Sequence, residues 1–137
     1  MCLNMKKPES HWREKLSLEQ YKILRLKGTE VPGTGKLLYN KERGTYMCGA
    51  CGNELFKSES KFDSGTGWPS FFNPLKKRNI KLEKDFSMLI PRTEVICAKC
   101  GSHLGHVFDE EKTKKCPTGK RYCINSLALT FRESKNK

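Results

Sequence analysis

The chain has 137 residues, of which 36% are hydrophobic and 31% are charged, and its net charge is +12. This length fits one domain, and the composition is that of a globular protein that buries its own core. No apolar run is long enough for a membrane-spanning helix, and the N-terminal residues lack the apolar stretch of a secretory signal, so we expect a cytoplasmic protein with no membrane partner.

The N-terminal region predicts a short helical part ahead of the main body. Residues 1–9 have the polar composition of a frayed tail. We assign residues 1–16 to a tail with a short helix and residues 17–137 to a single folded domain.

The first predicted helix follows a capping box at Ser17–Gln20, in which each end residue can bond the backbone of the other. Leu18, Tyr21 and Leu24 then fall on one face, and Gly28 ends the segment. We expect this helix to pack as a lid on the rest of the protein.

Short strand-like segments, separated by Gly, Asn, Pro and Ser, make up most of the remaining chain. Their spacing predicts an antiparallel, mainly β body. The predicted strands lie at residues 36–40, 44–48, 54–58, 80–85, 88–98, 106–110 and 121–131.

The last predicted strand carries an unusual set of side chains. Strand alternation places Arg121, Cys123 and Asn125 on one face. A nearby positive charge lowers the pKa of a thiol, so we expect Cys123 to be a thiolate near neutral pH. The same alternation continues this face into a core at Leu127, Leu129 and Phe131.

Two CxxC pairs, Cys48–Cys51 and Cys97–Cys100, could bring four thiolates to the corners of the tetrahedron that Zn²⁺ prefers. The 45 residues between the pairs mean that such a site would join two distant hairpins. Because four thiolates leave no open position, the zinc would hold the fold and take no part in catalysis. A redox CxxC pair and an iron–sulfur site are the alternatives.

Three further features point to a reactive site. His103 and His106 directly follow the second CxxC pair and suit hydrogen bonding or proton transfer to a substrate. Trp68 lies between Gly67 and Pro69, so a constrained loop would present its indole to a small apolar group. With Cys123, this set suits a sulfur electrophile that carries a polar oxygen and a methyl group.

Several segments of the chain resemble the methionine sulfoxide reductase B family when they are taken together and in order. They are SGTGWPSF, the two CxxC pairs, GSHLGHVFDE, PTG and RYCINS, and the resemblance covers roughly residues 17–132. It implies two antiparallel sheets in one zinc-stabilised domain with short N-terminal helices. It also implies reduction of the R epimer of methionine sulfoxide, mainly in oxidised proteins, back to methionine.

The resemblance also implies roles for single residues. Cys123 matches the nucleophile, which would become a sulfenic acid. The residues expected around the substrate are His103, His106 and Asn125 at the sulfoxide oxygen, Trp68 and Phe108 at the rest of the side chain, and Arg121 beside the thiolate. The residues expected to bind one structural Zn²⁺ are Cys48, Cys51, Cys97 and Cys100.

The thiol that would reduce this sulfenic acid is left open by the sequence. Many family members carry a resolving cysteine where this chain has Thr66. The candidates here are Cys116, which we favour, Cys2 on the tail, and an external thiol such as thioredoxin. We expect a monomer.

Two rival functions remain at this stage. The 27 Lys and Arg residues against 15 Asp and Glu, together with the CxxC pairs, would suit a zinc-ribbon nucleic-acid binder. The lysines are spread along the chain without interleaved aromatics, however, so we expect a basic solvated surface and no nucleic-acid partner. The second rival is a zinc module that binds a protein and has no catalysis.

Overall fold

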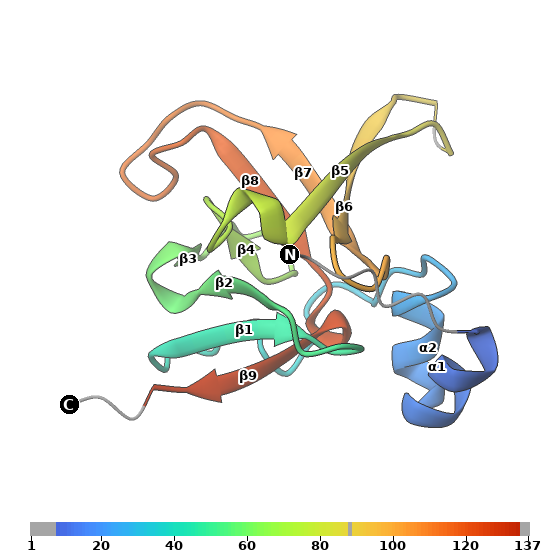
Figure 1. The fold of residues 1–137 in the computed structure, drawn as a ribbon. Helices are drawn as coiled ribbons and strands as arrows, with labels where there is room; N and C mark the ends of the chain where they lie inside the picture. Colours follow the sequence, from blue (N-terminus) through green and yellow to red (C-terminus); the bar gives the residue numbers. More distant parts are fainter. Residues whose placement is uncertain (1–7, 88, 135–137) are drawn as a thin grey trace.

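Two antiparallel sheets and two short N-terminal helices form the fold of the computed structural model, which describes residues 8–87 and 89–134 (Figure 1). The three-stranded sheet has the order β2-β1-β9, with bounds Glu54–Lys57, Gly44–Cys48 and Leu129–Glu133. The six-stranded sheet has the order β3-β4-β8-β7-β6-β5, with bounds Lys61–Phe62, Ser70–Phe71, Lys120–Ile124, His103–Asp109, Arg92–Cys97 and Ile80–Asp85. The predicted fold class is confirmed.

The core lies between the two sheets and is rich in aromatic rings. Phe56 on β2 stacks on Phe71 on β4, with ring centroids 4.4 Å apart. Tyr46 on β1 meets the same Phe71 ring edge-on at 5.0 Å. All three side chains are fully buried, and together they fasten one sheet to the other.

The helices α1, Glu9–Lys15, and α2, Leu18–Leu24, cover one end of the sheets (Figure 1). The capping box is confirmed, because the Gln20 backbone N–H donates to Ser17 Oγ and the Ser17 N–H donates to Gln20 Oε1. The predicted buried face is wrong in one position, since Leu18 is 68% exposed. Leu18 is the first residue of α2, and the buried face is formed further along it, by Tyr21, Ile23 and Leu24. None of the helices in the described residues has the length and hydropathy to cross a bilayer.

Most predicted strands are present, with two changes of extent. β6 begins at Arg92, later than predicted, and β7 begins at His103, earlier than predicted. The predicted strand at 36–40 is wrong. Its backbone groups are used in turns, where Leu38 N–H donates to Gly35 O and Asn40 N–H donates to Leu37 O.

The predicted strand at 121–131 is two strands, β8 and β9, which belong to different sheets. A 3₁₀ helix, Ser126–Ala128, separates them and shifts the alternation. Leu127 is therefore 36% exposed on this turn, so the expected core position is wrong for this residue. Leu129 is buried and Phe131 packs against the core, as expected. The buried face of β8 is the opposite one, formed by Tyr122 and Ile124. The other 3₁₀ helices are Ser58–Ser60 and Lys77–Asn79.

Candidate active site

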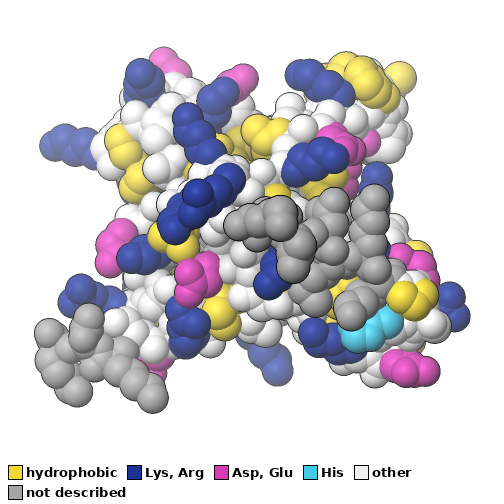
Figure 2. Space-filling model, in the orientation of Figure 1, with side chains coloured by type: hydrophobic (Ala, Val, Ile, Leu, Met, Phe, Trp, Pro, Cys, Tyr) yellow, Lys and Arg dark blue, Asp and Glu magenta, His cyan; other side chains and the backbone are white. Residues whose placement is uncertain are grey.

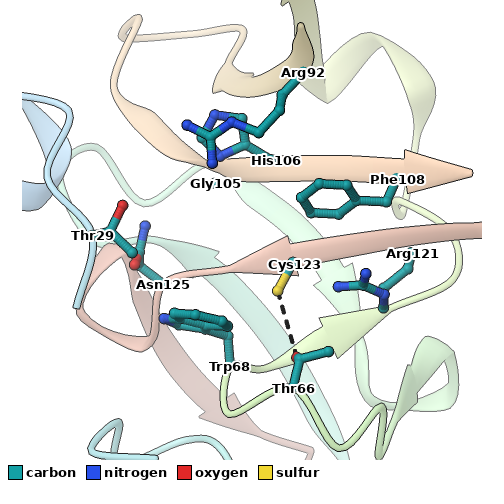
Figure 3. Close-up of a pocket in the computed structure, with 10 residues that line it drawn as sticks. All are labelled: Thr29, Thr66, Trp68, Arg92, Gly105, His106, Phe108, Arg121, Cys123 and Asn125. Carbon is teal, nitrogen blue, oxygen red and sulfur yellow. Dashed lines mark hydrogen bonds between the residues drawn. The ribbon is translucent and has the colours of Figure 1, made fainter. Parts of the chain in front are cut away.

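Cys123 lies in β8, between β4 and β7, on the wall of a pocket of about 220 Å³ (Figure 3). Its cross-strand partner on β7 is His106, and Phe108 pairs with Arg121 in the same way. Antiparallel pairing brings such partners to the same face. The predicted site residues that line this pocket are Arg121, Cys123, Asn125, His106, Phe108 and Trp68.

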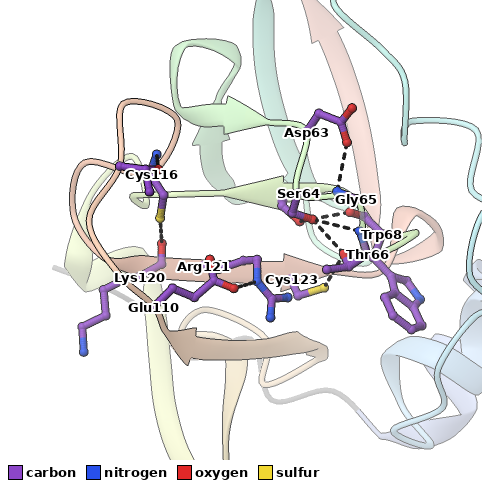
Figure 4. A network of polar contacts seen from close by, with 12 residues as sticks. Asp63, Ser64, Gly65, Thr66, Trp68, Glu110, Cys116, Lys120, Arg121 and Cys123 are labelled. Atoms are coloured by element: carbon purple, nitrogen blue, oxygen red, sulfur yellow. Dashed lines mark hydrogen bonds and ion pairs between the residues drawn. The ribbon is translucent and has the colours of Figure 1, made fainter.

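The Cys123 thiol is not activated in the way that the sequence predicts. Burial raises the pKa of Cys123, and the hydrogen bond with Thr66 and the charge of Arg121 oppose this rise only in part. Its Sγ lies 3.7 Å from Thr66 Oγ1. The Arg121 guanidinium interacts with Glu110 as well as with Cys123, because its Nε donates to the Glu110 carboxylate (Figure 4). The expected thiolate near neutral pH is therefore wrong for the free protein.

His106 is held by a carboxylate at the end of β5. Its Nε2 lies 2.8 Å from Asp85 Oδ2, and Arg92 Nη2 donates to the same oxygen at 3.3 Å. Hydrogen bonds from Ser87, and then from His106, hold the pKa of Asp85 well below its usual range. Because an ionised carboxylate can only accept, Nε2 of His106 carries the proton of this hydrogen bond.

His103 lies beside His106 and is not among the residues that line the pocket. The two rings have centroids 5.4 Å apart, and His103 is 4% exposed. Its Nδ1 lies 2.7 Å from Glu94 Oε2, and burial lowers the pKa of His103. The ring is then neutral, with Nδ1–H donating to Glu94. Nε2 is buried and has no hydrogen-bond partner among the described residues.

Residues 29–37, which we call the strap, fix two of the pocket side chains. Trp68 Nε1 donates to the Glu30 carbonyl oxygen at 3.0 Å, and Glu30 N–H donates to Asn125 Oδ1 at 3.0 Å. Asn125 Nδ2 in turn donates to Leu104 O at 3.0 Å. An amide nitrogen has two N–H groups, so one donor of Asn125 is left for a ligand in the pocket.

The strap and the loop of Trp68 touch so closely that the contact needs glycine. Gly33 N–H donates to Gly67 O at 2.8 Å. Gly67 has φ of +98°, and a Cβ added there would lie 2.7 Å from Pro32 Cβ. Both the backbone angle and the lack of space therefore exclude a larger residue.

Sequence reasoning missed several residues that line the pocket or hold its side chains. Thr29, Arg92 and Gly105 also line the pocket, and Glu30 and Asp85 hold its side chains. The one sequence signal that could have pointed to Asp85 and Arg92 is their place on either side of a hairpin turn, where they pair across the strands.

The four cysteines of the CxxC pairs form a separate cluster. Their sulfur atoms all lie within 4.8 Å of one another, with Cys48 Sγ 3.7 Å from Cys100 Sγ and Cys51 Sγ 3.6 Å from Cys97 Sγ. Four thiolates at Zn–S distances of about 2.3 Å would be separated by about 3.8 Å. The cluster therefore has the chemistry and the dimensions of a metal site.

Cys116, the favoured resolving cysteine, is not brought to Cys123. Cys116 is buried in the loop before β8, and its Sγ lies 3.3 Å from the carbonyl oxygen of Lys120. Lys120 is the first residue of β8, three positions from Cys123 (Figure 4). Three strand residues span about 10 Å. Cys2 lies outside the described residues.

Comparison with known proteins identifies relatives along almost the whole chain. The model of the SelR domain family matches residues 16–133. The peptide methionine sulfoxide reductase MsrB of Methanosarcina barkeri is 53% identical over 128 residues, which cover 93% of this chain and 88% of that protein. The protein of the same name from Leptospira interrogans is 49% identical over 133 residues, which cover 97% of this chain and 99% of that protein.

Proposed function

The chain belongs to the MsrB family of peptide methionine sulfoxide reductases, and on that premise we propose that Cys123 is the nucleophile with which it reduces methionine-R-sulfoxide in proteins. The observation that supports this assignment is the set of side chains around the thiol. Cys123 shares one pocket with the His106 imidazole, a free N–H of Asn125 and the rings of Trp68 and Phe108.

The proposed reaction begins with attack of Cys123 Sγ on the sulfoxide sulfur, which forms an S–S bond. The oxygen then passes to Cys123 Sγ, so that a new S–O bond forms on the cysteine while the S–S bond and the S–O bond of the substrate break. The sulfoxide is reduced to methionine, and Cys123 is oxidised by two electrons to a sulfenic acid that keeps the oxygen. Because its pKa is raised, the thiol enters the reaction with its proton. This proton can pass to the sulfoxide oxygen as the attack develops.

We propose that His106 and Asn125 contact the sulfoxide oxygen of the bound substrate. The Asp85 carboxylate accepts from Nε2 and fixes the His106 ring, which leaves Nδ1 as the nitrogen available to the substrate. Asn125 contributes its remaining N–H. His103 packs against His106, and we assign it a positioning role. Trp68 and Phe108 provide the apolar surface for the methyl group.

The test is reduction by the Cys123→Ser variant of a peptide that contains methionine-R-sulfoxide. We expect no methionine to be formed, while the metal content and the melting temperature stay close to those of the wild type. Cys116→Ser is the matched control, since it removes another buried thiol, and it should still form one methionine per enzyme without added reductant. Methionine formation by Cys123→Ser would contradict the assignment.

For the recycling step we propose direct attack of an external thiol, such as thioredoxin or a small thiol, on the sulfenic acid of Cys123. This proposal is supported by the position of Cys116, which would have to leave its contacts with Thr113 and Lys120 to reach Cys123. Mass spectrometry after one turnover without reductant should show Cys123 still as the sulfenic acid. A disulfide of Cys123 with Cys116 or Cys2 would contradict the proposal.

We also propose that the four-cysteine cluster binds one structural Zn²⁺. The donor set supports this identity, because four thiolates in a tetrahedron suit zinc. The ion would supply stability only.

A further inference from the structure

The hairpin between β5 and β6 exposes three large apolar side chains at its tip. Phe86 is 72% exposed, Ile90 is 77% exposed and Leu89 is fully exposed. We call these three residues the apolar tip. Figure 2 shows hydrophobic side chains gathered at the upper right, where Figure 1 places the end of this hairpin. Clustered exposed apolar side chains on a small protein often mark a contact surface.

The two strand residues that flank this turn belong to the active site. Asp85, the last residue of β5, bonds His106, and Arg92, the first residue of β6, lines the pocket. Phe86 directly follows Asp85, and Ile90 stands two residues before Arg92. The apolar tip is therefore next along the chain, on both sides, to residues that form or hold the pocket.

The size of the pocket shows how much of a substrate must lie outside it. Its volume of about 220 Å³ is below the range of roughly 300–1,000 Å³ that is usual for sites that enclose a whole small ligand. One side chain fits, so the residues that flank it in a polypeptide have to lie on the rim.

We propose that the apolar tip is a docking surface for the substrate polypeptide, and that it favours segments in which apolar residues flank the methionine sulfoxide. This inference rests on the proposed function. Methionine is among the residue types that are most often buried, so it commonly packs beside other apolar side chains. Oxidation makes its side chain polar and disrupts such a core. The segment that then becomes exposed carries both the sulfoxide for the pocket and apolar side chains for the tip.

The test compares two substrates on a variant with Phe86→Ser, Leu89→Ser and Ile90→Ser together. One substrate is the amide of N-acetylmethionine-R-sulfoxide, and the other is a ten-residue peptide with Leu and Val on both sides of the sulfoxide. We expect kcat/KM on the peptide to fall about tenfold, mainly through KM, because the lost contacts bury apolar area. Activity on the amide should be unchanged. The control is Leu18→Ser, which removes an equally exposed side chain from α2 and should alter neither activity.

Binding gives a readout that does not depend on catalysis. A fluorescent form of the peptide should bind the Cys123→Ser variant more tightly than it binds a Cys123→Ser variant that also carries the three serine substitutions of the apolar tip. Equal binding, or an equal loss of activity on both substrates, would overturn the docking proposal. The proposal would also be overturned if the wild type had the mass of a dimer in solution and the variant with all three serine substitutions had the mass of a monomer. Failure of the wild type to reduce either substrate would instead contradict the proposed function.

Discussion

The charge that Cys123 experiences depends on a neighbouring ion pair. Arg121 lies over the Phe108 ring, with its guanidinium carbon 4.6 Å from the ring centroid, and its Nε donates to Glu110. The carboxylate of Glu110 opposes the field of the guanidinium at the thiol. Burial then dominates, and the pKa of Cys123 is raised.

Glu110→Gln should therefore make Cys123 more reactive. Loss of the carboxylate charge leaves the positive charge of Arg121 unopposed, which lowers the pKa of Cys123 and increases the thiolate fraction at pH 7. We expect alkylation of Cys123 by iodoacetamide to become about three- to tenfold faster at this pH. The rate is measured by mass spectrometry of the peptide that contains Cys123.

The pH profile adds a second check on the same variant. In the wild type the alkylation rate should keep rising into the alkaline range, because the pKa is raised. In Glu110→Gln the rise should begin at lower pH. Glu111→Gln removes the adjacent exposed carboxylate and should leave the profile unchanged. A slower reaction in Glu110→Gln would show that the ion pair does not set the thiol reactivity.

Residues that act through local periodicity could be predicted from the sequence. The shared face of Arg121, Cys123 and Asn125 needs only strand alternation, and all three line the pocket. The pKa of Cys123 could not be predicted, because it depends on burial and on Arg121. The ion-pair partner of Arg121 is Glu110, which lies beyond the end of β7 and 11 residues from Arg121 along the chain. Glu30 was missed for the same reason, since its bond to Asn125 joins residues 95 positions apart.

At the level of secondary structure, the strap decides how the pocket is shaped and where the last strand breaks. Glu30 Oε1 accepts from Leu127 N–H at 2.9 Å, and Leu37 N–H donates to Ser126 Oγ at 2.9 Å. Both bonds hold the 3₁₀ turn that separates β8 from β9. Alternation of the residues 121–131 gives no sign of this turn, because the partners that stabilise it come from a segment near the N-terminus.

Gly35→Ala should disturb the strap. A Cβ added at Gly35 would lie 2.4 Å from Ser126 Cβ and 2.5 Å from Glu30 Oε2, so the strap would have to move. We expect a loss of about 1–3 kcal/mol in the free energy of unfolding, as is usual for overpacking. KM should rise as well, because Trp68 and Asn125 share Glu30 as their anchor. Denaturant unfolding and steady-state kinetics measure the two effects.

Gly33→Ala is the matched control on the same strap. Gly33 has φ of +82°, and a Cβ added there would meet no atom within 4 Å. Gly33→Ala should therefore lower the free energy of unfolding by about 1–2 kcal/mol through backbone strain alone, and KM should be unchanged. If both variants change KM equally, the packing of the strap against Ser126 does not position the pocket.

At the scale of the whole molecule, the cysteine cluster connects the two sheets. Cys48 ends β1 of the three-stranded sheet and Cys97 ends β6 of the six-stranded sheet. Cys51 and Cys100 lie in the turns that follow them. This arrangement could be predicted, because the CxxC spacing is dictated by the chemistry of the ligands. The role of the apolar tip could not be predicted, because it depends on where the fold places the hairpin of β5 and β6 relative to the pocket.

Removal of the metal should therefore destabilise the protein as a unit. A bound Zn²⁺ would crosslink two hairpins that are 45 residues apart in the chain, in addition to the aromatic contacts between the sheets. Structural zinc sites contribute several kcal/mol or more to folding. We expect a chelator, or Cys51→Ser, to lower the melting temperature by about 10 °C or more, in one cooperative transition seen by calorimetry.

Elemental analysis should give one zinc per chain in the wild type and in Cys116→Ser, and none in the destabilised samples. A metal-free protein with the wild-type melting temperature would show that the aromatic core alone joins the sheets.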